Sequence, residues 1–254
     1  WIDAIKKGKG LGRGEINYAN FLEDGDYTIR DHRIPKKIFG LIPNDLVPYL
    51  AKLFLNTQTM RVVNFLQAHT GNMSSDVQTD KVSLSKYHYL MDMKFPKYNF
   101  FFRHGFFLHQ SILPTENTID GFQELLKITH KYGFYSVMAA LKVYREQNEN
   151  FLLPFPMEGY SLTLDIPKNK SKIKEQVKMF YEMNDCVIKY GGRLYLGKTP
   201  VLSSNQFYEM YPNLNNFLSI KEKIDPNNLF ESNMYRRIMR VNHDDLKAPS
   251  IYAI

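Results

Sequence analysis

The sequence that decides the fold is YSLTLDI, at residues 160–166. Apolar and polar side chains alternate along it, so a β-strand here places the two kinds on opposite faces. The apolar set is Tyr160, Leu162, Leu164 and Ile166, and the polar set is Ser161, Thr163 and Asp165. The pattern therefore predicts a strand with one apolar and one polar face.

The neighbouring segments supply the rest of a sheet. Residues 99–113 are densely aromatic and end at Pro114, which predicts a strand pair or a bent strand buried on both faces. Further strands are expected at residues 134–144 and 193–197, and amphipathic helices at residues 119–129 and 172–189. This order of elements over residues 99–198 predicts an α+β fold, in which an antiparallel sheet is covered by helices packed on one face.

The segments that flank this region read as helical. Residues 46–68 carry apolar residues near helical spacing. After residue 198, Ser203 or Ser204 is placed to cap a helix that runs to Tyr211. A second helix is expected between Pro212 and Ile224, followed by a turn at residues 225–228.

The composition is that of a soluble globular protein, because 44% of the 254 residues are hydrophobic and 23% are charged. No run approaches the roughly 18 apolar residues that a transmembrane helix needs. The net charge of +7 suits acidic lipids, nucleic acid or phosphorylated substrates, but no nucleic-acid-binding motif accompanies it. The lysines between Lys168 and Lys174 are interpreted as a solvated helix start.

Metal and nucleotide motifs are absent from the sequence. Cys186 is the single cysteine, so it can form neither an intrachain disulfide nor a cysteine-based metal site, and we expect it in the core. His104 and His109 are close in sequence but lack an acidic partner at metal-ligand spacing. The glycines between Gly10 and Gly14 lack the strand-then-helix setting of a dinucleotide-binding loop. We therefore expect no metal site.

The sequence GGRLYLGK at residues 191–198 is the most informative about function. The double glycine permits close approach of the backbone to a ligand or to a neighbouring segment. Lys198 ends an otherwise apolar strand, so its ammonium group either reaches solvent or is aimed into a pocket. The residues alone leave both alternatives open.

This stretch resembles the C-terminal signature of the FAD-linked oxidase superfamily, of the vanillyl-alcohol oxidase and p-cresol methylhydroxylase type. Within it, the chain is most similar to the decaprenylphosphoryl-ribose 2′-oxidase group and to the sugar-lactone and alditol oxidases. The resemblance rests on residues 191–198, on Phe207 to Pro212, and on Asp225-Pro226 with Phe230, Ser232, Arg236 and Arg237. Earlier matches, in the same order, are Trp1-Ile2-Asp3, Gly12-Arg13-Gly14, Arg61, Asn64, Asp92, Asn99, Gly105-Phe106, Gln110, Pro114-Thr115 and Gly159 to Pro167.

The resemblance implies a division of the chain. Residues 1–190 would form the substrate-binding (cap) domain, and residues 191–254 would form a segment that returns to the FAD domain. The N-terminal FAD-binding subdomain of that family has no counterpart in this sequence. Because the chain begins at Trp1, in what reads as the middle of a strand, we expect it to be the C-terminal part of a longer protein and inactive alone.

The resemblance also implies roles for individual residues. Lys198 and Tyr195 match catalytic residues beside the flavin, and Tyr195, Gly197 and Lys198 would bind the cofactor, FAD. The residues implied to bind substrate are Gln110, Lys142, Tyr144, Ser161 and Thr163. Thr163 stands where the most similar group has cysteine, and Leu108 replaces a glutamine of that group. For Gln110 and Lys142 the alternative is an ordinary polar residue at a sheet edge.

The function implied by the resemblance is an FAD-dependent oxidase or dehydrogenase that acts on CH–OH donors. The substrate would be a sugar, a polyol or a lipid-linked sugar, whose hydroxyl-bearing carbon gives hydride to FAD. The alternative is a non-catalytic binding module with the same fold that has lost flavin. No nucleic-acid partner is expected, contact with a membrane surface is left open, and the expected location is cytoplasmic or peripheral to a membrane.

Overall fold

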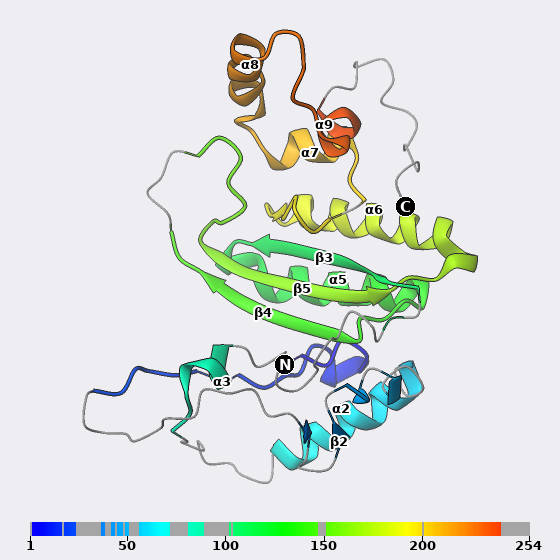
Figure 1. Ribbon diagram of the computed structural model, residues 1–254. Helices are drawn as coiled ribbons and strands as arrows, with labels where there is room; N and C mark the ends of the chain where they lie inside the picture. The colour runs from blue at the N-terminus through cyan, green and yellow to red at the C-terminus, as the bar shows by residue number, and fades with distance from the viewer. Residues whose placement is uncertain are drawn as a thin grey trace.

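The computed structural model describes most of the chain (Figure 1). The described residues are 2–16, 18–23, 37–38, 42–43, 45–47, 49–50, 56–71, 81–88, 102, 104–146, 151–199 and 201–239. Three positions of the family resemblance, Trp1, Asp92 and Asn99, lie outside them.

A four-stranded antiparallel sheet forms the centre of the fold. Its strands lie in the order β4-β5-β3-β6, and they are β3 (Phe106–Leu113), β4 (Met138–Tyr144), β5 (Gly159–Pro167) and β6 (Arg193–Leu194). Every pairing is antiparallel, with Gln110 opposite Thr163 and Lys142 opposite Ser161. The predicted antiparallel sheet is therefore confirmed, and β5 lies in its interior.

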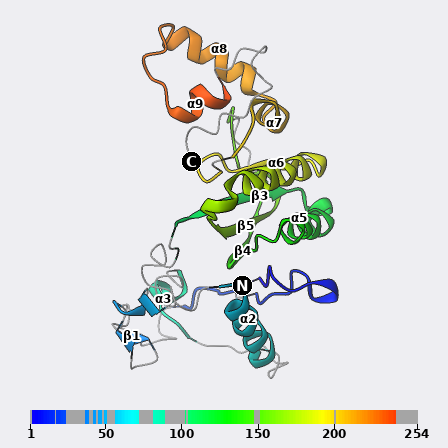
Figure 2. The same ribbon diagram turned by 90° about the vertical axis from the view of Figure 1, so that its right-hand side faces the viewer.

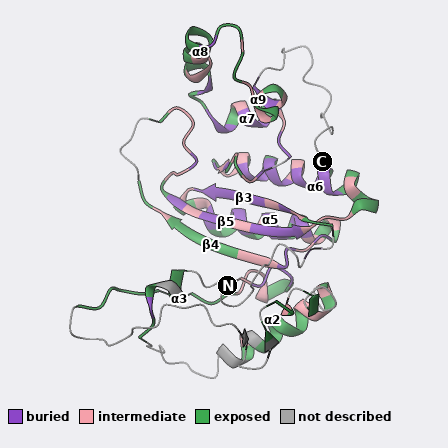
Figure 3. Ribbon diagram, viewed as in Figure 1, coloured by how far each residue is buried: buried purple, intermediate pink, exposed green. Residues whose placement is uncertain are grey.

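Two long helices cover one face of the sheet. They are α5 (Thr118–Tyr132) and α6 (Ile173–Lys189), which lie on the same side of the strands (Figure 2). Leu162, Leu164 and Ile166 of β5 are at most 1% exposed and pack into one cluster with residues of both helices. β3 and β5 are the most buried strands and β4 is largely exposed (Figure 3). The predicted α+β arrangement, with helices on one face, is confirmed.

Three predicted elements have different bounds in the structure. β4 begins at Met138, because Phe134 lies just beyond α5 and its N–H donates to Thr129 O at 3.1 Å, which closes the end of that helix. β6 ends at Leu194, because Lys198 N donates to Tyr195 O at 3.0 Å and closes a turn. The prediction that Lys198 ends a strand is therefore wrong. Within the helix expected at residues 46–68, residues 47, 49 and 50 are helical, residues 51–55 lie outside the described residues, and α2 spans Thr57–Gly71. Asn56 caps the first turn of α2.

The N-terminal residues and α2 lie at the β4 edge of the sheet (Figure 1). Asp3 accepts hydrogen bonds from Asn64 Nδ2 at 2.8 Å and from Arg13 Nε at 3.1 Å. All three residues belong to the family resemblance, so here the resemblance marks a buried structural cluster. The remaining short elements are η1 (Gly8–Gly10), β1 (Lys37–Ile38), β2 (Ile42–Pro43), α3 (Leu84–His88), η3 (Thr115–Asn117) and η4 (Lys170–Lys172).

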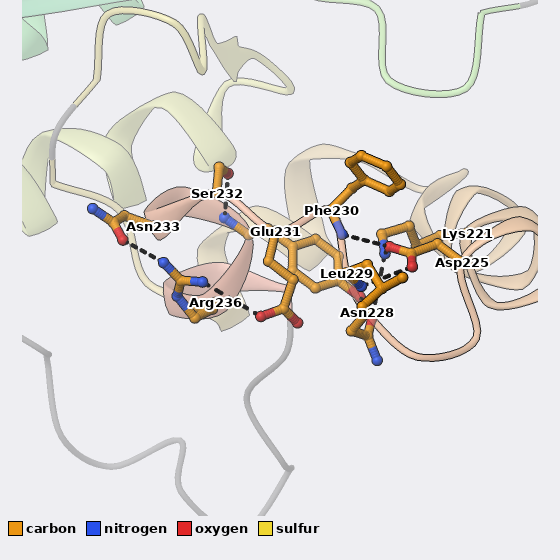
Figure 4. A network of polar contacts seen from close by, with 10 residues as sticks. Lys221, Asp225, Asn228, Leu229, Phe230, Glu231, Ser232, Asn233 and Arg236 are labelled. Carbon is orange, nitrogen blue, oxygen red and sulfur yellow. Dashed lines mark hydrogen bonds and ion pairs between the residues drawn. The ribbon is translucent and has the colours of Figure 1, made fainter.

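Among the described residues beyond α6, three helices form the C-terminal region. They are α7 (Ser204–Met210), α8 (Leu214–Ile224) and α9 (Asn233–Ile238), and Ser203 caps α7 in a capping box with Gln206. Between α8 and α9, Asp225 pairs with Lys221 and accepts the backbone N–H groups of Leu229 and Phe230 at 2.8 and 3.0 Å (Figure 4). None of the described helices combines the length and the hydrophobicity that a membrane-spanning segment requires.

Candidate functional site

The five residues expected to bind substrate share one face of the sheet. Gln110 lies opposite Thr163, which lies opposite Ala140, and Ser161 lies opposite Lys142. Directly paired residues of antiparallel strands project from the same face, and every second residue of a strand does so too. Since Leu162 and Leu164 project toward α5 and α6, the Gln110 face is the other one. We call it the polar face; it carries Gln110, Lys142, Tyr144, Ser161, Thr163 and Asp165.

The buried middle of the polar face, formed by Gln110, Ser161 and Thr163, contains polar atoms without hydrogen-bond partners. We call this part the floor. Gln110 is only 2% exposed, and its Nε2 donates to Ser161 Oγ at 3.2 Å. Its Oε1 atom, and Oγ1 of Thr163, are buried and make no hydrogen bond with any described residue. Unpartnered buried polar atoms are uncommon in proteins, and this sheet also has them on the helix-covered face, at Ser111 Oγ and both ring nitrogens of His109.

A turn brings Tyr195, Gly197 and Lys198 to the same floor. Tyr195 N donates to Gln110 O at 2.9 Å, which ties the start of the turn to β3. A Cβ at Gly197 would lie 3.2 Å from the Tyr195 ring, so glycine lets the turn fold closely over this side chain. The Lys198 ammonium lies 5.9 Å from the centre of the same ring. The structure thus brings the three residues together with Gln110.

The double glycine that precedes the turn serves packing. Gly191 ends α6 with a positive φ of 71°, and Gly192 N donates to Val187 O at 2.9 Å. A Cβ on Gly192 would lie 2.3 Å from Ile112 O. Of the two alternatives for this motif, the structure shows close approach to a neighbouring strand.

An aromatic row lies beside the turn. The rings of Tyr144 and Phe155 have centroids 5.8 Å apart, and those of Phe155 and Tyr195 are 5.0 Å apart. Phe155 comes from the segment between β4 and β5 and was not among the expected site residues, since nothing in its local sequence marks it. Aromatic rings of this kind stack on the apolar faces of sugars and of planar cofactors.

Asp165 is the second residue that sequence reasoning left out of the site. It is 8% exposed, and burial raises the pKa of its carboxyl group from 3.8 to about 6, while the positive charge of Lys198 opposes this rise. Burial is the larger of the two causes, and Lys198 itself is half-buried, so both alternatives for this lysine stay open. The alternation of residues 160–166 could have placed Asp165 in the site, because it puts Asp165 on the same face as Ser161 and Thr163.

Two candidate residues lie apart from this cluster. Lys142 is exposed on the outer strand and makes no ion pair with a described residue, although it shares the polar face. His109 projects toward α6, where its ring stacks on Phe180 with centroids 6.1 Å apart. Burial lowers the pKa of His109 to about 4, so it is a neutral core residue. The described residues contain no group of metal-ligating side chains, and Cys186 is buried and free.

Comparison with known proteins gives one family and two relatives. The family model described as D-arabinono-1,4-lactone oxidase matches residues 44–238. A decaprenylphosphoryl-β-D-ribose oxidase of Mycolicibacterium smegmatis is 28% identical over 243 residues, which are 94% of this chain and 50% of the relative. An uncharacterized protein in the mprA 5′ region of Streptomyces coelicolor is 28% identical over 86 residues, or 34% of this chain and 23% of that protein. The chain thus spans about half the length of the first relative and less of the second.

Proposed function

This chain belongs to the D-arabinono-1,4-lactone oxidase family, and on that premise we propose that it is the substrate-covering part of an FAD-dependent oxidoreductase. The substrate is a sugar, a polyol or a lipid-linked sugar, and the reaction oxidises one of its hydroxyl groups. The names of the family and of the Mycolicibacterium smegmatis relative support a sugar-related substrate. In this proposal residues 1–190 form the cap domain, and residues 191–254 return to a flavin-binding domain.

One observation carries the proposal: unpartnered buried oxygens lie beside the turn that carries Lys198. Gln110 Oε1 and Thr163 Oγ1 have no partner among the described residues, and Tyr195 N, at the start of that turn, donates to Gln110 O. Isoalloxazine carries both an N–H donor and carbonyl oxygens, and a sugar carries hydroxyl groups. The residues present therefore fit both the cofactor and the substrate class.

The chain's own residues would bind the cofactor, orient the substrate and stabilise the charge that develops in the reaction. Tyr195, Gly197 and Lys198 would hold the cofactor, and Lys198 would place positive charge where negative charge develops. Gln110, Ser161 and Thr163 would orient substrate hydroxyl groups on the floor, while Lys142 would act from the exposed rim. Tyr144 and Phe155 would exclude water from one side. Bound FAD would supply the two-electron acceptor for the alcohol carbon.

The charge of the chain bears on the form of the substrate. A net charge of +7 suits a phosphate-bearing substrate or an acidic membrane surface. We propose that a lipid-linked sugar would reach the site from such a surface. Binding to vesicles of anionic and of neutral lipid tests the membrane surface separately from the phosphate-bearing substrate. If the chain binds an acidic surface, only the anionic vesicles should bind it, in a salt-sensitive way.

Flavin absorbance tests the proposal most directly. The chain is purified as given and together with any coding sequence that precedes it in its gene, and each form is titrated with FAD. Flavin that is retained by the longer form, and bleached without oxygen by a sugar or polyol, is the expected result. If neither form binds flavin, the chain is a binding module that has kept the fold without the chemistry.

A matched pair of lysine variants links the flavin to the site. Lys198→Met should weaken flavin binding or bleaching, whereas Lys178→Met, on an exposed position of α6, should not. Equal behaviour of the two variants would remove Lys198 from the proposed role.

A further inference from the structure

We propose that a hollow between the N-terminal turn and the C-terminal end of α5 is a second binding site, which takes a phosphate group. The hollow has a volume of about 360 Å³ and is open to solvent, and its lining residues are Lys7, Gly8, Leu11, Lys127, His130 and Lys131. None of them belongs to the candidate site for cofactor and substrate. The inference therefore goes beyond the proposed function and holds with or without flavin.

The hollow lies on the helix-covered side of the sheet. Lys127, His130 and Lys131 belong to the last turns of α5, which packs on the face opposite the polar face. The other wall is the N-terminal segment around η1, which lies beside α5 (Figure 2). The sheet therefore separates a ligand in this hollow from Gln110 and Thr163.

Both walls of the hollow are held in place by hydrogen bonds. His130 Nε2 donates to Ala4 O at 2.8 Å, which ties the end of α5 to the N-terminal segment. Asp3 Oδ1 accepts the N–H of Lys6 at 3.1 Å, which fixes the backbone immediately before Lys7. A site whose walls are fixed before the ligand arrives loses less conformational entropy on binding.

The lining of the hollow is cationic, and none of the described residues that form it is acidic. Lys127 and Lys131 lie four residues apart on α5, a spacing at which like charges repel. The carboxylate of Glu182 relieves Lys131, since it accepts hydrogen bonds from Lys131 Nζ at 2.7 and 2.8 Å. Lys127 and Lys7 make no ion pair with any described residue. Two uncompensated ammonium groups thus border the same space.

The carboxylate nearest to Lys127 along α5 is already engaged elsewhere. Glu124 lies three residues before Lys127, a spacing at which an ion pair can form on a helix. Its carboxylate instead accepts Lys189 Nζ at 2.7 Å and the Tyr190 hydroxyl at 2.8 Å. Lys127 is therefore left for a partner from outside the chain.

A phosphate group is the anion that fits this arrangement. It carries about two negative charges at neutral pH and three or more strong acceptor oxygens, so it can bridge cations from two segments. The helix dipole alone accounts for His130 and Lys131 in the last turn of α5. It does not account for Lys127, which lies a turn earlier, or for Lys7. Leu11 adds an apolar side to the hollow for the carbon atoms that carry the phosphate.

The test is an NMR titration of the chain as given with inorganic phosphate, at an ionic strength held constant with sodium chloride. The backbone amide of Gly8 should shift in a saturable way. The double variant Lys7→Met with Lys127→Met should bind about tenfold more weakly or not at all. The matched control, Lys178→Met with Lys223→Met, removes the same charge from exposed positions elsewhere and should bind as the wild type does. Circular dichroism confirms that both variants are folded.

Vesicles identify the source of the phosphate group. The chain is sedimented with phosphatidylcholine vesicles that contain or lack phosphatidic acid. If a lipid headgroup is the ligand, only the acidic vesicles should retain the chain, and the Lys7 and Lys127 double variant should lose this retention. If a soluble phosphate compound is the ligand, the titration saturates and neither kind of vesicle retains the chain. No binding in either assay, or binding that the two double variants share equally, would overturn the inference. Neither assay contains flavin, so a failure here leaves the proposed function untouched.

Discussion

The hydroxyl group of Tyr211 donates a hydrogen bond of 2.6 Å to the carbonyl oxygen of Leu194. Both residues are at most 1% exposed. Leu194 is the last residue of β6 and immediately precedes Tyr195, so this bond ties the region of α7 to the strand that leads into the candidate site. Arg193 adds to the link, because its Nη1 donates to Pro154 O at 2.9 Å, next to Phe155.

Tyr211→Phe should lower the free energy of unfolding by about 1–3 kcal/mol, since it leaves a buried carbonyl without its partner. Urea unfolding followed by circular dichroism measures the change. Tyr160→Phe is the control, because the described structure gives the Tyr160 hydroxyl no hydrogen bond. A loss of the same size in both variants would mean that the Tyr211–Leu194 bond contributes nothing of its own.

Gly192→Ala should destabilise the protein far more than Gly133→Ala. A Cβ at Gly192 meets Ile112 O at 2.3 Å and Leu113 Cδ2 at 2.4 Å, so β3 or α6 must move, which costs about 3 kcal/mol or more. Gly133 has a φ of 73° but open space around it, so alanine there costs only about 1 kcal/mol of backbone strain. Thermal unfolding of the two variants compares them, and equal losses would contradict the packing role of Gly192.

His109 should make the protein less stable in acid. Its pKa is lowered by burial from 6.5 to about 4, so the unfolded chain binds more protons between these values and stability falls as pH falls through them. The contribution is on the order of 3 kcal/mol. Asp165 masks part of this slope, so the measurement is urea unfolding of Asp165→Asn across this range. A flat profile in that variant would show that His109 is not desolvated in the folded state.

Asp165 should act on stability with the opposite sign. Its folded pKa of about 6 lies above the ordinary 3.8, so the folded state binds more protons between these values and stability falls as pH rises through them. The loss is on the order of 3 kcal/mol, and it is complete above about pH 6. Asp165→Asn should therefore be more stable relative to the wild type at neutral pH than near pH 4. A constant difference at all pH values would contradict a raised pKa.

Lys198→Met should reduce kcat of the flavin-loaded protein by roughly a hundredfold, because it removes a preorganised positive charge from the reacting region. Steady-state kinetics with an aldonolactone or polyol substrate measures the loss. Lys178→Met controls for the charge removed. A changed KM with an unchanged kcat would assign Lys198 to substrate binding alone.

The antiparallel sheet was predictable because its signals are local. The alternation of residues 160–166 defines β5, and helical spacing defines α5 and α6. Bounds were less predictable where backbone hydrogen bonds decide them. Phe134 bonds to the end of α5, and Tyr195 closes a turn with Lys198, and neither bond has a signature in the pattern of hydrophobicity.

Several residues of the family resemblance proved to be structural. Asp225 caps the turn before α9, and Ser232 caps α9 through Tyr235 N at 3.0 Å (Figure 4). Asp3 holds Arg13 and Asn64 together at the other end of the chain. A match to a family signature therefore does not by itself distinguish a fold requirement from a site residue.

The sequence by itself determined the order of strands and helices, the apolar and polar faces of β5, and the glycine that ends α6, because each depends on residues close together in the chain. Only the tertiary structure decided which polar residues meet. Strand register placed Gln110 opposite Thr163, 53 positions apart by their numbers, and the segment after β6 placed Tyr195 against the backbone of Gln110. The raised pKa of Asp165 and the unpartnered oxygens of Gln110 and Thr163 follow from burial, which arises only when distant segments exclude water together.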